Sequence, residues 1–282
     1  MIRKELHYNR PFLGPAADGV RQLEEDGHYL ARAVFSPEQV ARLRAEVDAV
    51  FREHPPDCRP GSPTLEDAAK YRYEMFNRSA ACQAAIGERG LLDRLEPLLG
   101  DDCHALSCTA WRNPPGRDDA PYGMQWHVDG GPYIARPEGQ EWPAHIAYPI
   151  FVVTTQIYLH DVALEDGPTA VLPGSHKSGR LPPHEERWDV GLRYAGRGAE
   201  VHLAEAGDVT FFVSESWHRR MPTTDACKGR YFLQTAFGRR EIAQRLRLTE
   251  RHHCVDDAAL ARATTERARQ LLGIHPPGFY DS

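Results

Sequence analysis

The 282-residue chain has the composition of an ordinary globular protein, with 41% hydrophobic and 26% charged residues. Its formal net charge of −6 gives no electrostatic reason to expect a nucleic acid or an anionic membrane as a partner. No run reaches the roughly 18 apolar residues that span a bilayer, and the N-terminal MIRKELHYNRPF lacks the apolar centre of a signal peptide. We therefore expect a cytoplasmic monomer or homodimer that binds a small molecule.

The 6 cysteines are scattered along the chain and form no CxxC pair. A disulfide framework is not expected in a cytosolic chain of this length, and a structural zinc site needs ligands in closer pairs. Buried or surface thiols are the simpler interpretation.

The N-terminal third begins with a predicted strand in DGHYLARAVF, where apolar residues alternate. Ser36 then opens a predicted helix, because Pro37 suits the first helical position and Gln39 completes a capping box. Apolar residues follow at helical spacing until Pro55 and Pro56 end the helix. A second short helix is predicted for residues 91–99.

The middle of the chain changes to strands separated by loops rich in Pro and Gly. The clearest predicted strands are Ile150–Leu159, Thr169–Leu172, Val209–Val213 and Tyr231–Phe237. Helices are predicted again for residues 241–248 and 256–272. This pattern predicts a mainly β fold with flanking helices, a jelly-roll barrel within a single domain covering residues 1–282. The barrel core is expected at about 104–240, with helical support at 36–100 and 241–272.

The strongest chemical signal is the segment Gln125-Trp126-His127-Val128-Asp129. In an extended backbone, residues two apart project to the same side, so His127 and Asp129 can reach one metal ion. Two histidines and one carboxylate on one face of a metal suit Fe(II) and leave positions open for a cosubstrate and oxygen. His218, which follows the predicted strand Val209–Val213, supplies the third ligand in this interpretation.

Arg230 makes His218 a stronger candidate for the third metal ligand, because Arg230 begins the next predicted strand twelve residues later. A hairpin between the two would place the guanidinium deep in the barrel on the His218 side. A buried arginine needs an anion, and a planar guanidinium matches a carboxylate in a two-pronged geometry. 2-Oxoglutarate offers that carboxylate.

Four segments together resemble the phytanoyl-CoA dioxygenase family of Fe(II)/2-oxoglutarate oxygenases. A more specific resemblance within the family, to the oxygenases that form orthosomycin and hygromycin B orthoesters, is an expectation that no single residue carries. The segments are DGHYLARAVFSPEQVARLRAEV, WHVDGGPY, DGPTAVLPGSHK, and GDVTFF with the later WH and GRYFLQTAF. The resemblance implies a double-stranded β-helix. It also implies Fe(II) held by His127, Asp129 and His218, the cosubstrates 2-oxoglutarate and O2, and a cosubstrate contact from Arg230.

The chain departs from the family pattern at two places. Arg220 stands where the family often has a small hydroxyl residue that helps the arginine hold the cosubstrate, so we expect Thr223 or Thr224 to supply the hydroxyl, or none. Gln156 stands where some members carry an aromatic residue, and it could hydrogen-bond the keto-acid carboxylate. The resemblance also permits a cosubstrate contact from Tyr71 or Tyr73.

Other candidate residues have simpler interpretations. His176 lies in the PGSHK turn and is expected to be structural or to support a ligand, while the adjacent His252 and His253 are expected to face solvent. Arg112 is expected to form a surface salt bridge rather than to hold an anion. Trp126 is expected to pack.

Two alternative functions differ in class from the oxygenase. A cupin-type metal isomerase or binding barrel would carry His-x-His and a following Glu ligand, whereas this chain has His127-Val128-Asp129. A family member that has lost its metal and only binds ligands would not need an intact triad with Arg230. The His127-Val128-Asp129 motif and the intact triad with Arg230 favour an oxygenase that hydroxylates a substrate or closes a ring oxidatively.

The predicted mouth loops, 130–148 and 178–200, indicate the substrate class. They contain the aromatic residues Trp142, Trp188, Tyr133 and Tyr194 and the acidic residues Glu138, Glu141, Glu185, Glu186 and Asp189. Aromatic faces suit sugar rings and carboxylates attract ammonium groups. We expect a sugar or aminoglycoside, as in bacterial antibiotic biosynthesis; the alternative is an acyl-CoA or other small-molecule hydroxylase of the same family.

Overall fold

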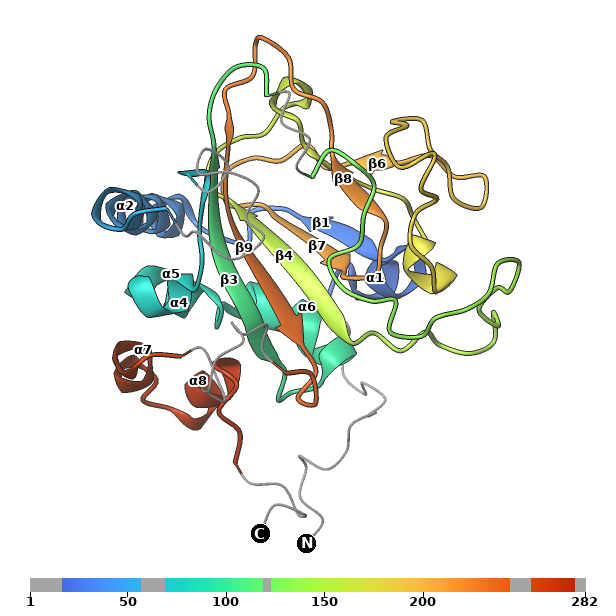
Figure 1. Cartoon of the computed structure of the whole chain (residues 1–282). Helices are drawn as coiled ribbons and strands as arrows, with labels where there is room; N and C mark the ends of the chain where they lie inside the picture. The colour runs from blue at the N-terminus through green and yellow to red at the C-terminus, as the bar shows by residue number, and fades with distance from the viewer. Residues whose placement is uncertain (1–16, 57–68, 119–122, 244–254, 277–282) are drawn as a thin grey trace, which may run out of the picture.

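The computed structural model describes residues 17–56, 69–118, 123–243 and 255–276. Its strands form two antiparallel sheets with helices on the outer face of the larger one (Figure 1). The predicted class, mainly β with flanking helices, is confirmed. The α-helices are α1 Val20–Asp26, α2 Pro37–Glu53, α4 Met75–Arg78, α5 Ala80–Ala85, α6 Arg89–Leu99, α7 Asp257–Arg262 and α8 Glu266–Leu271. The strands are β1 His28–Ala31, β2 Tyr71–Arg72, β3 His104–Asn113, β4 Val152–Tyr158, β5 Thr169–Val171, β6 Glu200–Val201, β7 Val209–Val213, β8 His218–Arg220 and β9 Arg230–Gly238.

The larger sheet has 6 strands in the order β1-β7-β4-β9-β3-β2. All residues of β4 and β7 are buried, because these strands are covered on both faces. Strand β4 pairs with β9 in a register that sets Gln156 opposite Gln234, and with β7 in a register that sets Gln156 opposite Thr210. The sheet therefore presents a row of polar side chains within an otherwise apolar layer.

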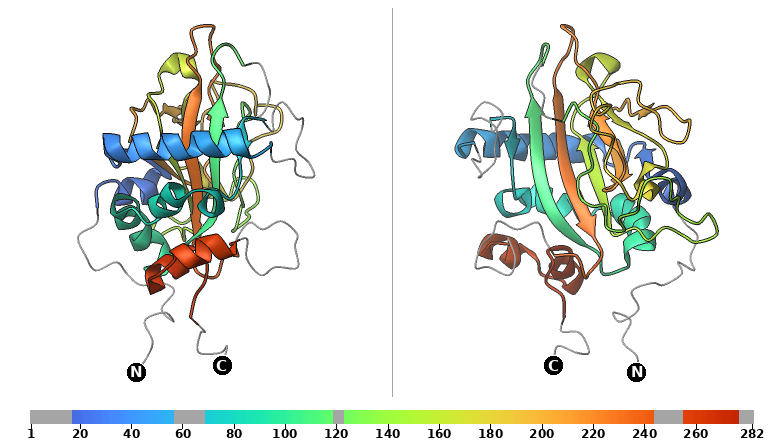
Figure 2. Two further views of the ribbon diagram at one scale, coloured as in Figure 1. Left: turned by 90° about the vertical axis from the view of Figure 1, so that its left-hand side faces the viewer. Right: turned by 45° about the vertical axis from the view of Figure 1, so that its right-hand side comes forward.

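The smaller sheet has 3 strands in the order β6-β5-β8 and lies across from the larger one (Figure 2). Strand β8 pairs with β5, so that His218 lies opposite Val171 and Arg220 lies opposite Thr169. This pairing brings the segment after β7 and the predicted strand at residue 169 to one wall of the space between the sheets.

Helices α2, α4, α5, α7 and α8 cover the outer face of β3 and β9 (Figures 1 and 2). Their buried residues, such as Val47 of α2 and Phe76 of α4, join Phe237 and Leu233 of the sheet in the largest hydrophobic cluster. The cap predicted at Ser36 is confirmed: its Oγ accepts from the N–H of Gln39, and the Gln39 side chain accepts from the N–H of Ser36. The helices thus brace one side of the sheet and leave its other side for the site.

Three expectations about elements need correction or addition. The helix predicted for 256–272 is two helices, because Thr265 caps the N–H of Ala268 and restarts the helix after Ala263. Strand β3 was not among the clearest predicted strands, and the predicted N-terminal strand, β1, joins the large sheet together with β2 from before residue 104. Of the helix predicted for 241–248, only residues 241–243 are described, and they form a turn.

In the described part of the chain, no helix combines the length and the apolar character needed to cross a membrane.

Candidate active site

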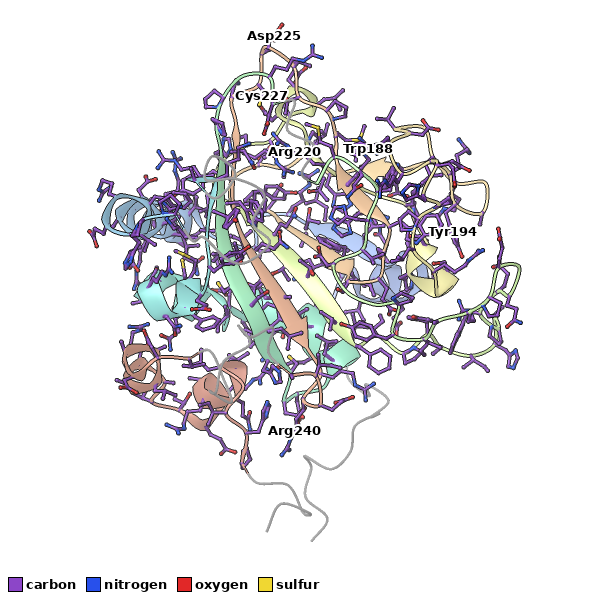
Figure 3. The ribbon with its side chains drawn as sticks, viewed as in Figure 1. Trp188, Tyr194, Arg220, Asp225, Cys227 and Arg240 are labelled. Atoms are coloured by element: carbon purple, nitrogen blue, oxygen red, sulfur yellow. The ribbon has the colours of Figure 1, made fainter. Side chains whose placement is uncertain are left out.

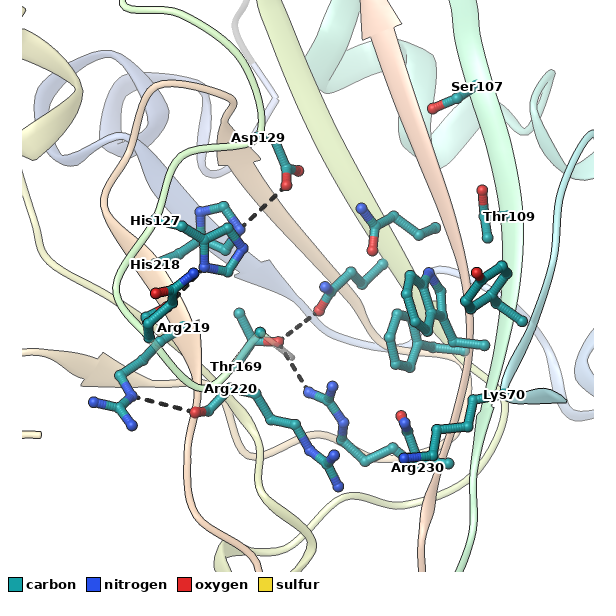
Figure 4. Close-up of a pocket in the computed structure, with 18 of the residues that line it drawn as sticks. Lys70, Ser107, Thr109, His127, Asp129, Thr169, His218, Arg219, Arg220 and Arg230 are labelled. Atoms are coloured by element: carbon teal, nitrogen blue, oxygen red, sulfur yellow. Dashed lines mark hydrogen bonds and ion pairs between the residues drawn. The ribbon is translucent and has the colours of Figure 1, made fainter. Parts of the chain in front are cut away.

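A cavity of about 490 Å³ lies between the two sheets. Strands β3, β4 and β9 of the large sheet form one wall, while β5, β8 and the segment 123–129 form the other (Figure 4). Of the residues singled out from the sequence, His127, Asp129, His218, Arg230, Gln156, Tyr71 and Tyr73 line this cavity.

His127 and His218 are brought together by an isolated antiparallel bridge between two segments that are distant in sequence. The N–H of each residue donates to the carbonyl of the other at 3.0 Å. Their rings lie 4.3 Å apart between centroids, and Asp129 Oδ1 is 3.4 Å from His218 Nε2. One ligand atom from each of His127, Asp129 and His218 lies within 4.8 Å of the other two, the spacing that one metal ion requires.

The tautomer of both imidazoles follows from their backbone contacts. His127 Nδ1 lies 2.8 Å from the carbonyl oxygen of Gln125, and His218 Nδ1 lies 3.0 Å from that of Ser216. A carbonyl oxygen only accepts, so each Nδ1 carries a proton, and in the neutral ring Nε2 then keeps its lone pair for a metal ion. This arrangement fixes the ring orientation that metal-binding histidines need.

Asp129 is oriented by two contacts. Its N–H donates to the carbonyl of Ser214 at 3.0 Å, and its Oδ2 accepts from Thr154 Oγ1 of β4 at 3.0 Å. The other oxygen, Oδ1, faces His218. The carboxylate is therefore held so that one oxygen is directed to the centre of the triad.

The electrostatics of the triad favour a neutral imidazole. Burial, followed by the neighbouring His218, lowers the pKa of His127 to about 4. A neutral histidine is the form that binds a metal ion. Two imidazoles and one carboxylate form a donor set that fits Fe(II), with one face left for further ligands. Among the residues that the structure describes, this is the only group of histidine, cysteine or acidic side chains with such spacing.

Arg230, at the start of β9, is buried in the wall of the same cavity. Its Nη1 donates to Thr169 Oγ1 of β5 at 3.4 Å (Figure 4). Burial, followed by the nearby positive charge of Arg220, lowers the pKa of Arg230 to about 9. A guanidinium in such surroundings is stabilised by an anion, because both the lost hydration and the like charge disfavour its charged form.

The hairpin expected between His218 and Arg230 does not form. Strand β8 pairs with β5 in the small sheet, whereas β9 pairs with β3 and β4 in the large sheet. The connecting residues cross from one sheet to the other, so Arg230 faces the triad across the cavity instead of from a neighbouring strand.

Gln156 of β4 is oriented by two hydroxyl groups. Its Oε1 accepts from Thr169 Oγ1 at 2.8 Å and from Tyr158 Oη at 3.3 Å. Tyr158 Oη lies 3.1 Å from Thr210 Oγ1, which lies 2.9 Å from Nδ1 of the buried His202. Because the amide oxygen is taken by these donors, the amide nitrogen is the group left to donate to a ligand.

Residues 23–227 match the family model described as phytanoyl-CoA dioxygenase, which is most of the chain. The chain belongs to the phytanoyl-CoA dioxygenase family. An ectoine dioxygenase from Bordetella bronchiseptica is 23% identical over 228 residues, which cover 72% of this chain and 69% of that protein.

Solved structures give the same architecture for this phytanoyl-CoA dioxygenase family member. The epimerase SnoN, in complex with Fe3+, alpha ketoglutarate and nogalamycin RO, superposes with a TM-score of 0.60 at 18% identity, covering 80% of this chain and 84% of SnoN. HygX from Streptomyces hygroscopicus, with nickel and 2-oxoglutarate bound, superposes with a TM-score of 0.59 at 15% identity, covering 82% of this chain and 89% of HygX. The expected double-stranded β-helix is thereby confirmed.

Thr223, expected as a hydroxyl partner of the arginine, does not line the cavity of this family member. Its Oγ1 accepts from the N–H of Asp118 at 2.8 Å, so it holds the Asp118 loop. Thr169 is the hydroxyl residue that contacts Arg230. The sequence did not predict this contact, because Thr169 and Arg230 lie on different sheets. The position of Thr169 in the predicted strand of DGPTAV was a local signal that its hydroxyl could face the barrel interior.

The remaining candidates have structural contacts. His176 is buried, with Nε2 3.3 Å from the carbonyl of Glu24, and Arg112 pairs with Asp48 at 3.3 Å. Trp126 packs in the cluster beneath the small sheet. His252 and His253 lie outside the described residues.

The mouth loops do not meet the cavity as expected. Neither Trp142 nor Trp188 lines it, and Trp142 instead packs against Tyr148 at 5.0 Å between ring centroids. The acidic residues of these loops are also absent from the described lining, and Glu138 is 94% exposed. The loops therefore give no carboxylate to the described cavity wall.

Proposed function

We propose that the protein is an Fe(II)- and 2-oxoglutarate-dependent dioxygenase that oxidises a C–H bond of a small, hydroxyl-rich molecule. One observation carries this proposal: the His-Asp-His triad, with its Nε2 atoms free for a metal ion, lines the same cavity as Arg230. The guanidinium of Arg230 is buried and therefore needs an anionic partner. A 2-oxo dicarboxylic acid needs both features, a metal for its keto-acid end and a cation for its other end.

His127, Asp129 and His218 would hold the iron, and Arg230 would bind the distal carboxylate of 2-oxoglutarate. Bound iron would supply the activation of O2: one oxygen atom would enter succinate as 2-oxoglutarate loses CO2, and the other would end in the hydroxylated substrate or, in a ring closure, in water. Thr154 keeps the Asp129 carboxylate in place, and Gln156 offers an amide N–H to a carboxylate oxygen.

The substrate side of the cavity favours a neutral, polar molecule. Ser107, Thr109 and Gln234 offer hydroxyl and amide groups, while Tyr73 and Trp111 offer ring faces. Such a wall suits a sugar or cyclitol, and a long acyl chain would instead call for a continuous apolar groove.

The described residues of the cavity wall offer few carboxylates that could bind an ammonium group of the substrate. These carboxylates are Asp129 of the triad and Asp118, which is bound by Arg220 at 2.7 Å and lies 3.4 Å from Lys70. An aminoglycoside would therefore place its amines towards the mouth and a hydroxylated carbon towards the triad. The structurally similar SnoN and HygX have been solved in complexes with nogalamycin RO and hygromycin B, respectively. This likeness supports a role in natural-product biosynthesis, by hydroxylation or oxidative cyclisation.

Succinate release tests this function. The Fe(II)-loaded protein is incubated aerobically with 2-oxoglutarate and a panel of neutral glycosides, aminoglycosides and acyl-CoA thioesters, with Asp129→Ala as the inactive control. We expect succinate formation to be stimulated by a glycoside or aminoglycoside and to be absent in the control. Stimulation by acyl-CoA alone would contradict the substrate class, and equal succinate formation by the control would contradict the metal site.

A further inference from the structure

Arg220 is a buried cation whose hydrogen-bonding capacity is only partly used. It lies two residues after His218 on β8 and is 6% exposed in the cavity wall (Figure 3). Its Nη1 donates to Asp118 Oδ2 at 2.7 Å. Its Nε and Nη2 are buried and have no hydrogen-bond partner among the described residues. A guanidinium has five donors, and leaving charged donors unsatisfied in a buried place is costly.

The surroundings of Arg220 carry an excess of positive charge. Lys70, Arg220 and Arg230 all line the cavity. Of the two carboxylates among the described lining residues, Asp118 pairs with Lys70 and Arg220. Asp129, the other one, belongs to the triad. Arg220 and Arg230 lie below Thr169 in Figure 4, at one end of the cavity and away from Asp129. Two guanidiniums at one buried place require an anion between them or beside them.

We propose that Arg220 and Arg230 together bind the distal carboxylate of the cosubstrate, so that Arg220 sets the preference for a dicarboxylic 2-oxo acid. This inference rests on the proposed function. Arg230 is held by Thr169 Oγ1, and its Nε is also buried without a partner in the described structure. A carboxylate has about four lone-pair sites, enough to accept from both guanidiniums and from one amide N–H.

The role differs from that of a small hydroxyl residue at this position. A hydroxyl adds one neutral hydrogen bond, whereas Arg220 adds a charge and two unpartnered donor nitrogens, Nε and Nη2, in a fixed plane. Its link to Asp118 keeps the guanidinium from turning towards solvent. The chain therefore gains a stronger dependence on the second carboxylate than one arginine would give.

Anaerobic binding of two 2-oxo acids tests this inference. The Fe(II)-loaded protein is titrated with 2-oxoglutarate and with pyruvate, which lacks the distal carboxylate, and the visible absorption of the iron chelate is recorded. The variants are Arg220→Gln, Arg220→Lys and Arg230→Gln. Arg112→Gln is the matched control, because Arg112 is 51% exposed on β3 and does not line the cavity.

We expect Arg220→Gln to raise the Kd of 2-oxoglutarate about tenfold or more, since a hydrogen bond to a charged group is lost. Its Kd for pyruvate should stay within about twofold of the wild-type value, because pyruvate does not reach the two arginines. Arg220→Lys keeps the charge without the planar guanidinium, so its Kd for 2-oxoglutarate should lie between those of the wild type and Arg220→Gln. Arg230→Gln should show the same selectivity for 2-oxoglutarate, and Arg112→Gln should behave as wild type.

An unchanged Kd for 2-oxoglutarate in Arg220→Gln would overturn the inference; if the variant then raised the KM of an acidic substrate, the site would belong to that substrate. An equal loss of affinity for both 2-oxo acids would also overturn it, because it would mean that Arg220 only supports the fold. If the wild-type protein formed no chelate with either acid, the proposed function itself would fail.

Discussion

Arg230 is the residue whose removal separates cosubstrate binding from metal binding. It lies in the same cavity as the triad but contacts Thr169 and not the triad residues. We expect Arg230→Ala to raise the 2-oxoglutarate concentration needed for half-maximal turnover by roughly two orders of magnitude, because a charge-assisted two-pronged contact is lost. Fe(II) affinity, measured by titration of the same variant, should change little. An unchanged 2-oxoglutarate dependence would make the arginine structural.

Thr154 orients Asp129, the proposed carboxylate ligand of the metal. Its Oγ1 donates to Asp129 Oδ2 at 3.0 Å, so Thr154→Val removes the contact with little change in volume. Loss of a residue that orients a ligand typically weakens metal binding by about 10- to 100-fold. Thr155→Val is the matched control, since Thr155 Oγ1 donates to the carbonyl of Thr235 instead. Equal Fe(II) affinity in the two variants would show that Asp129 does not depend on Thr154.

Residues of the site differ in how far the sequence can predict them. His127 and Asp129 are two apart on an extended segment, so local geometry alone brings them to one side. Thr154 and Thr169 were not predicted, because each acts through a side chain from a distant strand. Thr223 or Thr224 is the expected hydroxyl partner because Arg220 occupies the position where the family often has one, but Thr223 instead accepts from the N–H of Asp118.

At the scale of elements, the capping box at Ser36 fixes the start of α2, the helix that lies across β3 and β9 (Figure 2). Ser36→Ala removes the side chain that accepts from the N–H of Gln39. We expect the variant to lose about 0.5–2 kcal/mol in free energy of unfolding, measured by urea denaturation. Ser36→Asp, which keeps an accepting oxygen, should unfold close to wild type. A variant Ser36→Ala as stable as wild type would mean that packing alone sets the start of α2.

Strands were predictable where β-branched and aromatic residues run together, as in Val209–Val213. Strand β3 was missed because its central residues, such as Ser107 and Cys108, are small or polar, and pairing with β9 decides its conformation. The break in the C-terminal helix falls at Thr264 and Thr265, and threonine favours a cap over a helix interior, so this pair was a local signal that the helical spacing of the apolar residues outweighed. Which sheet a strand joins, as for β8 and β9, depends on contacts that no local pattern contains.

For the whole molecule, buried neutral histidines make stability depend on pH. Burial, as the largest cause, lowers the pKa of His176 and of His202 to about 3. In the unfolded chain an imidazole titrates near 6.5, so between these values the unfolded state binds more protons than the folded state. The free energy of unfolding should therefore fall as the pH decreases from about 6.5, by up to about 1.4 kcal/mol per pH unit for each histidine.

Denaturation by urea at several values between pH 7.5 and 4.5 measures this slope. His202→Gln removes one of these buried histidines and should flatten the slope below pH 6.5, even where it lowers the overall stability. Parallel curves for the variant and the wild type would contradict the assignment of His202 as a buried neutral group.

The central claim is that the barrel holds one Fe(II) ion through His127, Asp129 and His218. Anaerobic titration of the metal-free protein with Fe(II), followed by equilibrium dialysis, tests it most directly. We predict one equivalent bound per wild-type chain and loss of that site in His127→Ala, Asp129→Ala and His218→Ala, each checked for a native circular dichroism spectrum. One equivalent bound with wild-type affinity by all three variants would contradict the claim.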